Sequence, residues 1–151
     1  PIAIILMGVT FNVVNGILLG KGLFSFPPSS FNEGTAFFLR PLSLFGIAAF
    51  FLGMGINLHS DHVIRHLRKP GDTNHYLPSK GLYRYVTSAN YFGELIEWIG
   101  FALFTTIPAA WVFVIWTAAN LIPRSAAIHK CYRKEFGDAV GKRKRIIPFI
   151  Y

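Results

Sequence analysis

The apolar residues of this chain are gathered into four blocks rather than spread along it. The blocks run from Ile2 to Leu19, Ala36 to Leu58, Tyr91 to Phe104 and Ala109 to Ile122, the last continuing helically towards Tyr132. Each block can cross a membrane as a helix, since the hydrocarbon core of a bilayer is about 30 Å thick. With 52% hydrophobic residues, the chain is too apolar for an ordinary soluble domain. The sequence therefore predicts an all-α fold, a multi-pass transmembrane helix bundle of about four spans in one membrane domain, residues 1–151.

The segments between the blocks carry turn and helix-breaking residues. We expect a loop from Gly22 to Gly34 and a tight turn from Thr105 to Pro108 between the last two spans. Helical character after the second block should continue through Arg68 and stop at Pro70-Gly71, because proline and glycine break helices. The final residues, Ile146 to Tyr151, are apolar enough to dock back on the body of the protein.

Positive charge is concentrated in two segments. Of 15 Lys and Arg, five lie between Arg65 and Arg84 and eight between Arg124 and Arg145, and a four-span topology places both segments on one side of the membrane. The positive-inside rule predicts that this side, with the C-terminus, is cytoplasmic, at the endoplasmic reticulum of a eukaryote or the inner membrane of a bacterium. Attraction of these basic segments to anionic membrane lipid explains part of the charge. Nucleic-acid binding explains it poorly, since no recognition module is visible.

A polar stripe lies at the cytoplasmic end of the second block. It consists of Asn57, Asp61, Arg65 and Arg68, spaced by four, four and three residues. This spacing stacks the side chains on one helical face. An amide, a carboxylate and two guanidinium groups suit a ligand with phosphates and hydroxyls, because arginine binds phosphate oxygens in a bidentate manner. A helix face held by salt bridges accounts for the same spacing about equally well.

Three histidines in the same segment invite a metal interpretation. They are His59, His62 and His66, of which the last two are four residues apart on a helix. The chain has only five histidines and a single cysteine, Cys131, and a second ligand cluster is missing from the sequence. We therefore predict interfacial histidines and no metal site.

Two carboxylates, Glu94 and Glu97, interrupt the third block. Together with Asn90 they form an i, i+4, i+7 set on one helical face. A carboxylate at membrane depth costs about 2.5–3.5 kcal/mol on insertion scales, so it usually faces a protein interior. Such groups anchor substrates, relay protons or accept hydrogen bonds, and they also serve as polar contacts between helices.

A third polar set lies at the cytoplasmic end of the last span. It consists of Arg124, His129 and Tyr132, and Arg124 and Tyr132 share a helical face because they are eight residues apart. An arginine and an aromatic ring can hold a phosphate and stack a base, or simply anchor the membrane interface. All three sets fall at the cytoplasmic ends of their helices. We therefore expect them to converge on one cavity that is open to the cytosol and binds a large anionic ligand.

Several motifs resemble the steroid 5α-reductase family. They are G-M-G-I-N-L-H-S-D-H-V-I-R-H-L-R-K-P-G (Gly53 to Gly71), Leu77-Pro78 followed by Gly81-Leu82-Tyr83, the run from Ala89 to Gly100, and Ile147-Pro148-Phe149-Ile150. Their order and spacing match the family over essentially the whole chain. The related isoprenylcysteine carboxyl methyltransferases usually show an Arg-His-Pro motif, where this chain has Thr87-Ser88-Ala89-Asn90.

The resemblance implies a seven-span membrane reductase that uses NADPH to reduce the Δ4 double bond of a 3-oxo steroid, delivering hydride to C5. It implies that Asn90 and Glu94 hold the nicotinamide end of the cofactor. Asp61, Arg68 and Arg124 are expected at its ribose and phosphates, and Tyr132 at its adenosine part. Further cofactor contacts are expected from Asn57, Arg65 and His129. A steroid, or another apolar enone, would enter from the bilayer while NADPH enters from the cytosol.

The chain also departs from the family pattern. Family members often have a tyrosine directly before an Ile-Pro pair. The corresponding segment here is His75-Tyr76-Leu77-Pro78, so His75 or Tyr76 would make the loop contact with the cofactor. The family's substrate-polarising glutamate and tyrosine lie in earlier spans, so this chain, which opens with Pro1, is expected to be the C-terminal part of a longer protein. Alternatives are a reductase of the same fold acting on another lipid enoyl or sterol double bond, and an S-adenosylmethionine-dependent methyltransferase.

Overall fold

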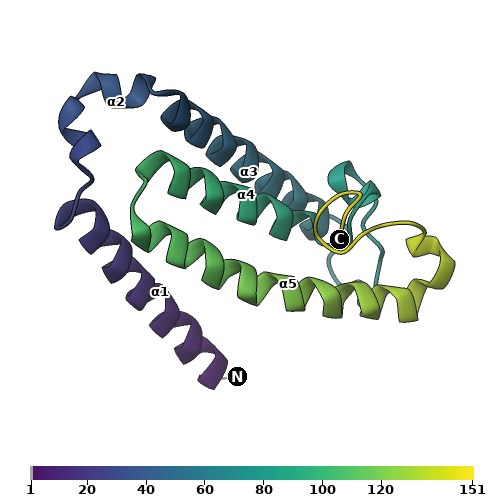
Figure 1. Ribbon diagram of the computed structural model, residues 1–151. Coiled ribbons are helices and arrows are strands. Elements are labelled where there is room, and N and C mark those ends of the chain that lie inside the picture. Colours follow the sequence, from purple (N-terminus) through teal and green to yellow (C-terminus); the bar gives the residue numbers. More distant parts are fainter. Residues whose placement is uncertain (1) are drawn as a thin grey trace.

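The computed structural model describes residues 2–151, and helices dominate it (Figure 1). The long helices are α1 (Ile2–Phe24), α3 (Pro41–Arg65), α4 (Ala89–Thr105) and α5 (Pro108–Phe136). Shorter elements are η1 (Ser29–Glu33), α2 (Thr35–Leu39), η2 (Gly81–Arg84) and η3 (Gly137–Val140). Within residues 2–151 the extended pairing is limited to one isolated parallel bridge, between Val86 and Lys144. The predicted all-α bundle is confirmed.

The second predicted span differs from the structure at both ends. Instead of one helix from Ala36, α2 ends at Leu39, the backbone is extended at Arg40, and α3 begins with Pro41 in its first turn. The break has a local cause, because proline disfavours helical backbone at the residue before it.

At its other end α3 stops at Arg65, so the prediction that the helix continues through Arg68 to Pro70 is wrong. The amide of His66 still donates to the carbonyl of His62, but Leu67 donates to Ile64, only three residues back. This tighter turn closes the helix. Arg68 therefore lies outside α3 and does not share its polar stripe.

The other boundaries are close to expectation. α1 continues to Phe24, so the beginning of the predicted Gly22–Gly34 loop is helical and η1 occupies much of the remainder. α4 begins two residues before Tyr91, and α5 continues past Tyr132 to Phe136 as predicted. The tight turn between them is confirmed, with Thr106 at a positive φ of 58°.

Helices α3 and α4 run antiparallel in unusually close contact. Four buried glycines line this contact, namely Gly46 and Gly53 on α3 and Gly93 and Gly100 on α4. A methyl group added at Gly46 would lie 2.5 Å from the backbone nitrogen of Phe104. One added at Gly93 would lie 2.6 Å from the backbone nitrogen of Asn57. Small residues that let backbones approach are a common way of joining membrane helices, and here they fix α4 along α3.

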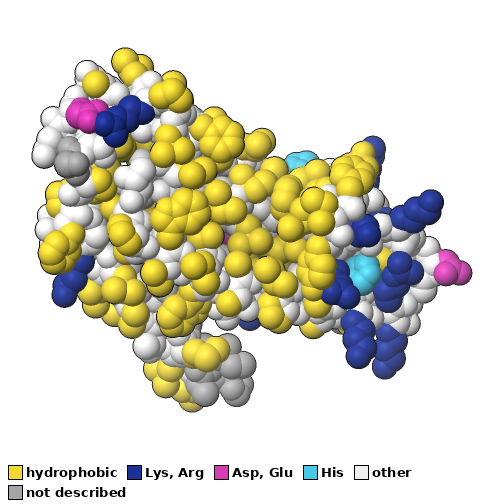
Figure 2. Space-filling view, viewed as in Figure 1, with side chains coloured by type: hydrophobic (Ala, Val, Ile, Leu, Met, Phe, Trp, Pro, Cys, Tyr) yellow, Lys and Arg dark blue, Asp and Glu magenta, His cyan; other side chains and the backbone are white. Residues whose placement is uncertain are grey.

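The remaining contacts of the bundle are aromatic and aliphatic. α1 crosses α5, where the ring of Phe11 lies 5.4 Å from that of Trp116 and 5.9 Å from that of Phe113. At the α4–α5 turn, Ile107 is fully buried in a cluster with Ala102 and Ala110. Much of the outer surface is apolar, and Figure 2 shows hydrophobic side chains over most of one face.

Three helical segments are long and apolar enough to cross a membrane: Ile5–Phe24, Pro41–Arg65 and Pro108–Val140. α4 has 17 residues, about 26 Å at 1.5 Å per residue, and contains Glu94 and Glu97. Figure 2 shows Lys and Arg side chains gathered at the end where α5 and the C-terminal tail finish. At the opposite end Arg40 is paired with Glu33. An apolar body between charged ends is the pattern of an integral membrane protein.

The C-terminal tail docks on the bundle, as predicted. Ile146 is fully buried, and the amides of Thr87 and Ser88 donate to the carbonyls of Lys144 and Arg145 over 2.9 and 3.0 Å. The anchor is thus Ile146 and the backbone before it, whereas the apolar Phe149 and Ile150 of the tail remain largely exposed. Through these bonds the tail covers the segment that leads into α4.

Candidate functional site

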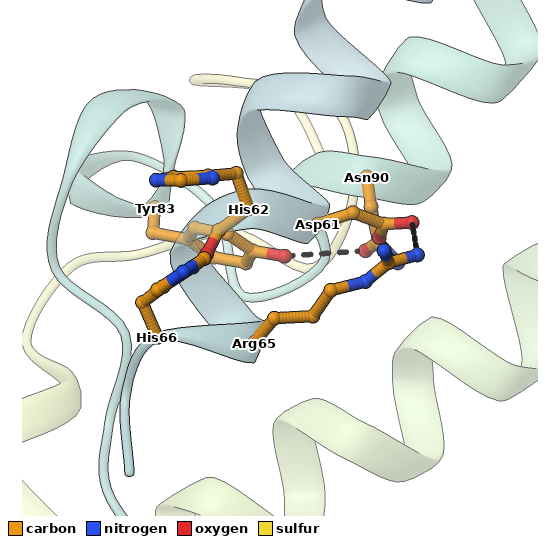
Figure 3. A network of polar contacts seen from close by, with 6 residues as sticks. All are labelled: Asp61, His62, Arg65, His66, Tyr83 and Asn90. Carbon is orange, nitrogen blue, oxygen red and sulfur yellow. Dashed lines mark hydrogen bonds and ion pairs between the residues drawn. The ribbon is translucent and has the colours of Figure 1, made fainter. Parts of the chain in front are cut away.

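A polar network joins three elements at the basic end of the bundle (Figure 3). The hydroxyl of Tyr83 in η2 donates to the side-chain oxygen of Asn90 on α4, 3.4 Å away. The amide nitrogen of Asn90 donates to a carboxylate oxygen of Asp61 on α3, also over 3.4 Å. The other carboxylate oxygen of Asp61 lies 3.9 Å from a guanidinium nitrogen of Arg65. Asn90 is therefore oriented from both sides.

Tyr83 is the buried member of this network. Its side chain is 1% exposed, and it packs with Val63, Val86 and Ala89. Burial raises the pKa of the Tyr83 hydroxyl well above its ordinary value. The hydroxyl therefore stays protonated at physiological pH and remains a hydrogen-bond donor to Asn90.

The helical faces explain why Asn57, Asp61, Asn90 and Glu94 gather. Asn57 and Asp61 are four residues apart on α3, and Asn90 and Glu94 are four apart on α4, so each pair lies on one face. The close glycine contact brings the backbone of Asn57 directly beside Gly93. All four side chains are partly exposed, which leaves polar atoms available to a ligand. We call these four residues the candidate site.

Helix α5 approaches the candidate site with charge and an aromatic ring. Arg124 is exposed on α5. Tyr132 is half-buried two turns later, with Arg68 among its charged neighbours. The structure thus joins α3 and α4 through the hydrogen bond between Asn90 and Asp61, and a cavity shared by all three predicted sets stays a prediction.

The remaining predicted residues lie at the periphery. His129 on α5 places its ring nitrogen 3.3 Å from the hydroxyl oxygen of Thr87, beside the N-terminus of α4. Arg65 keeps a side chain that is 78% exposed, and Arg68 is also exposed. Of these residues, Arg65 contacts the candidate site through its ion pair with Asp61.

The loop residues His75 and Tyr76 contact other parts of this chain. A ring nitrogen of His75 lies 2.8 Å from a carboxylate oxygen of Glu135, which ties the loop to the end of α5. The hydroxyl of Tyr76 donates to Asp72 over 2.8 Å. Hydrogen bonds from the amide of Asn74 and from Tyr76 hold the pKa of the Asp72 carboxyl below its ordinary value. The loop is thus ordered by its own contacts and by α5.

His62 in the last turn of α3 and His66 just after it form a pair of neighbouring rings. The ring centroids of His62 and His66 are 4.0 Å apart, and the ring nitrogen of His66 lies 2.8 Å from the carbonyl of His62. Over the described residues, no group of three or more His, Cys, Asp or Glu is arranged to hold a metal ion.

Sequence reasoning missed Tyr83 as a site residue. Tyr83 stands in the Gly81-Leu82-Tyr83 motif, but η2 is too short to give a helical period that would place its side chain against Asn90. The sequence also offers Tyr85 two residues later, so its local pattern does not single out Tyr83.

Comparison with known proteins settles the family. The family model described as 3-oxo-5-alpha-steroid 4-dehydrogenase matches residues 1–151. The chain is 41% identical to human 3-oxo-5-alpha-steroid 4-dehydrogenase 2 over 151 residues, all of this chain and 58% of that protein. This chain belongs to the steroid 5α-reductase family.

Two type 1 members of the steroid 5α-reductase family are similarly close. The mouse protein is 42% identical over 140 residues, which is 93% of this chain and 53% of the mouse protein. The rat protein is 46% identical over 111 residues, 74% of this chain and 43% of the rat protein. The chain thus spans about half the length of the curated relatives it matches.

Proposed function

We propose that this chain forms the cofactor-binding half of an NADPH-dependent steroid 5α-reductase. The reaction is reduction of the Δ4 double bond of a 3-oxo steroid by hydride transfer to C5 within a membrane helix bundle. The observation that carries the proposal is the Tyr83–Asn90–Asp61 network, which holds a polar amide in one orientation at the basic end of an apolar bundle. Membership of the steroid 5α-reductase family supports the choice of substrate.

The candidate site matches the groups of NADPH in chemical kind. Asn90 and Glu94 offer an amide and a carboxylate, which suit the carboxamide of a nicotinamide. Arg68 and Arg124 are exposed guanidinium groups, which suit the phosphates. The ring of Tyr132 suits the adenine, since aromatic side chains stack on bases. When bound, NADPH supplies the hydride.

In this proposal, the residues of this chain bind the cofactor and orient it. Tyr83 and Asp61 fix the amide of Asn90, so less conformational entropy is lost when that amide meets a ligand. The closely packed pair of α3 and α4 is a rigid support for groups that must be held within a fraction of an ångström. The apolar surface around this pair lets a steroid arrive from the bilayer. The residues that polarise the steroid carbonyl are expected outside this chain.

The test is a binding assay with NADPH and the purified protein in detergent. Binding is measured by the quenching of tryptophan fluorescence. We expect NADPH to bind, and we expect Asn90→Ala and Arg68→Ala each to weaken its binding about 10- to 100-fold, as for hydrogen bonds to charged groups. Matched controls are Asn120→Ala, an exposed amide bonded within its own helix, and Arg40→Ala at the other end of the molecule. The controls should bind like wild type.

Two results would overturn the proposal. One is equal NADPH affinity in wild type, Asn90→Ala and Arg68→Ala. The other is thermal stabilisation by S-adenosylmethionine without stabilisation by NADPH, which would indicate a methyltransferase. A panel of 3-oxo-Δ4 steroids and other lipid enones, scored by NADPH oxidation, then distinguishes a steroid reductase from one that acts on another lipid double bond.

A further inference from the structure

Two hollows meet at the cytoplasmic end of α3, on the helical side away from the candidate site. The first, which we call the α3 groove, has a volume of about 750 Å³. Its wall on α3 is apolar and includes Phe51, Leu52 and Gly55, and Leu82 and Arg84 close it from η2. Phe51 and Leu52 are 59% and 61% exposed, so the groove opens on the apolar outer surface of the bundle.

The second hollow, which we call the histidine pocket, has a volume of about 310 Å³ and is more enclosed. Its lining combines the apolar side chains of Val63 and Leu67 with hydrogen-bonding and basic side chains, namely His59, His62, His66, Ser79 and Lys80. The neighbouring rings of His62 and His66, drawn in Figure 3, both line it. An ammonium, a hydroxyl and imidazole nitrogens are the donors that bind phosphate oxygens.

His59 joins the two hollows, because it lines both. It is two residues from Asn57 and from Asp61, which places it on the opposite side of α3 from them. Gly81 fixes its position. A methyl group at Gly81 would lie 2.6 Å from Nε2 of His59, and the φ of Gly81 is +58°, so a glycine is required there on both grounds.

The two hollows together would accommodate an amphipathic ligand, with its apolar part in the α3 groove and its polar part in the histidine pocket. The α3 groove offers an apolar channel that continues into a pocket of phosphate-binding groups. Gly55 leaves the channel open, since no atom lies within 4 Å of a methyl group built on it. The pocket lies at the end of the molecule where Lys and Arg gather (Figure 2), and Lys80 and Arg84 flank His59.

We propose that the α3 groove and the histidine pocket bind one anionic phospholipid, with an acyl chain along Gly55 and the phosphate at His59, Lys80 and Arg84. An anionic lipid is favoured over a zwitterionic one because the head-group end of the site is basic and carries no acidic lining residue in either hollow. A soluble phosphate would fill the pocket but would leave the apolar groove unused.

The test is native mass spectrometry of the purified protein with phosphatidylglycerol and with phosphatidylcholine of the same acyl chains. We expect phosphatidylglycerol to bind with at least about fivefold higher occupancy at one site. Inorganic phosphate at millimolar concentration should not displace it, because the acyl chain contributes to binding. Displacement by phosphate, or equal occupancy by both lipids, would overturn the proposal.

Two pairs of variants locate the site. Gly55→Leu fills the groove and should abolish preferential binding, whereas Gly16→Leu adds the same side chain where α1 has open space. Lys80→Gln with Arg84→Gln should weaken phosphatidylglycerol binding about tenfold. Lys130→Gln with Lys134→Gln removes the same charge from exposed positions on α5 and should have little effect.

The variants also separate the other possible occupants. If a protein segment or a second copy of the chain covers the groove, Gly55→Leu leaves lipid binding unchanged and the proposal fails. Equal losses in the Lys80/Arg84 and the Lys130/Lys134 variants would mean that the preference comes from total charge and not from this site. That result would overturn the proposal as well.

Discussion

Asn90 shows how a single amide can be held ready inside a membrane bundle. Its oxygen accepts from a buried tyrosine and its nitrogen donates to a carboxylate, so exchanging its two ends would set the amide oxygen against the carboxylate of Asp61. The donor, Tyr83, comes from a short helical turn, and the acceptor, Asp61, comes from the last turn but one of α3. A polar side chain fixed in this way costs less entropy when it meets a ligand.

The Tyr83 hydroxyl predicts a dependence of stability on pH. In the unfolded chain a tyrosine ionises near pH 10, about its reference pKa, whereas burial raises the pKa of Tyr83 in the folded protein. The unfolded state therefore binds fewer protons above about pH 10, and the free energy of unfolding falls as the pH rises through that range. Below about pH 10 this contribution is fully present. Tyr83→Phe should reduce the fall, measured by thermal unfolding in detergent between about pH 9 and 11.

Tyr85→Phe is the matched control for this prediction, because Tyr85 is two residues away and 45% exposed. At neutral pH, Tyr83→Phe should cost about 1 kcal/mol through the lost hydrogen bond to Asn90. An identical alkaline loss in wild type and Tyr83→Phe would contradict the assignment.

At the scale of elements, the α3–α4 pair is the rigid part of the fold. The glycines repeat every seven residues on both helices, which keeps them on one face over two turns. The backbones consequently come closer than larger side chains would allow, and Asp61 is brought within hydrogen-bonding distance of Asn90.

Gly53→Ala should destabilise this pair. The added methyl group would lie 2.6 Å from the carbonyl oxygen of Gly93, which is too close for any real contact, so the helices must separate. We expect a loss of about 1–3 kcal/mol in the free energy of unfolding, the usual cost of overpacking. Gly55→Ala is the control on the same helix, since open space surrounds it, and alanine favours a helix over glycine. Equal stability of the two variants, measured by thermal unfolding, would argue against the close contact.

The C-terminal tail supplies a second prediction at this scale. Ile146 is fully buried and sits beside the carbonyls that accept from Thr87 and Ser88, so Ile146→Ala should cost about 2–5 kcal/mol. Ile150→Ala, at a position that is 75% exposed, should cost little. Because the tail covers the entry to α4, the Ile146 variant should also increase hydrogen exchange at Thr87 and Ser88. Unchanged exchange there would mean that the tail does not protect this segment.

For the whole molecule, the distribution of charge defines an orientation. Lys and Arg gather at the end that carries the candidate site, and the opposite end carries the Arg40–Glu33 pair (Figure 2). The positive-inside rule therefore predicts that the candidate site faces the cytoplasm.

Labelling with a membrane-impermeant maleimide in sealed vesicles tests this orientation. With Cys131→Ser as background, Lys142→Cys should react only from the cytoplasmic side and Asn32→Cys only from the other side. Both positions are exposed and lie at opposite ends of the bundle. Reaction of both from the same side would contradict the proposed topology.

The sequence by itself determined what depends on local pattern. Three of the four apolar blocks correspond to single helices, and the second is divided between α2 and α3. The Thr105–Pro108 segment forms the predicted turn, and the spacing of Asn57 with Asp61 and of Asn90 with Glu94 places each pair on one face. These features follow from hydrophobic periodicity and from proline and glycine, which act within a few residues. The family motifs likewise lie in continuous stretches.

The tertiary structure alone decided what depends on residues far apart in the chain. It placed Tyr83 against Asn90, set the distance between α3 and α4, ended α3 before Arg68 and docked Ile146 beneath the entry to α4. Each of these results needs partners from different elements, and local propensity carries no information about such partners. Burial and backbone contact between separate helices therefore settled which of the polar side chains meet.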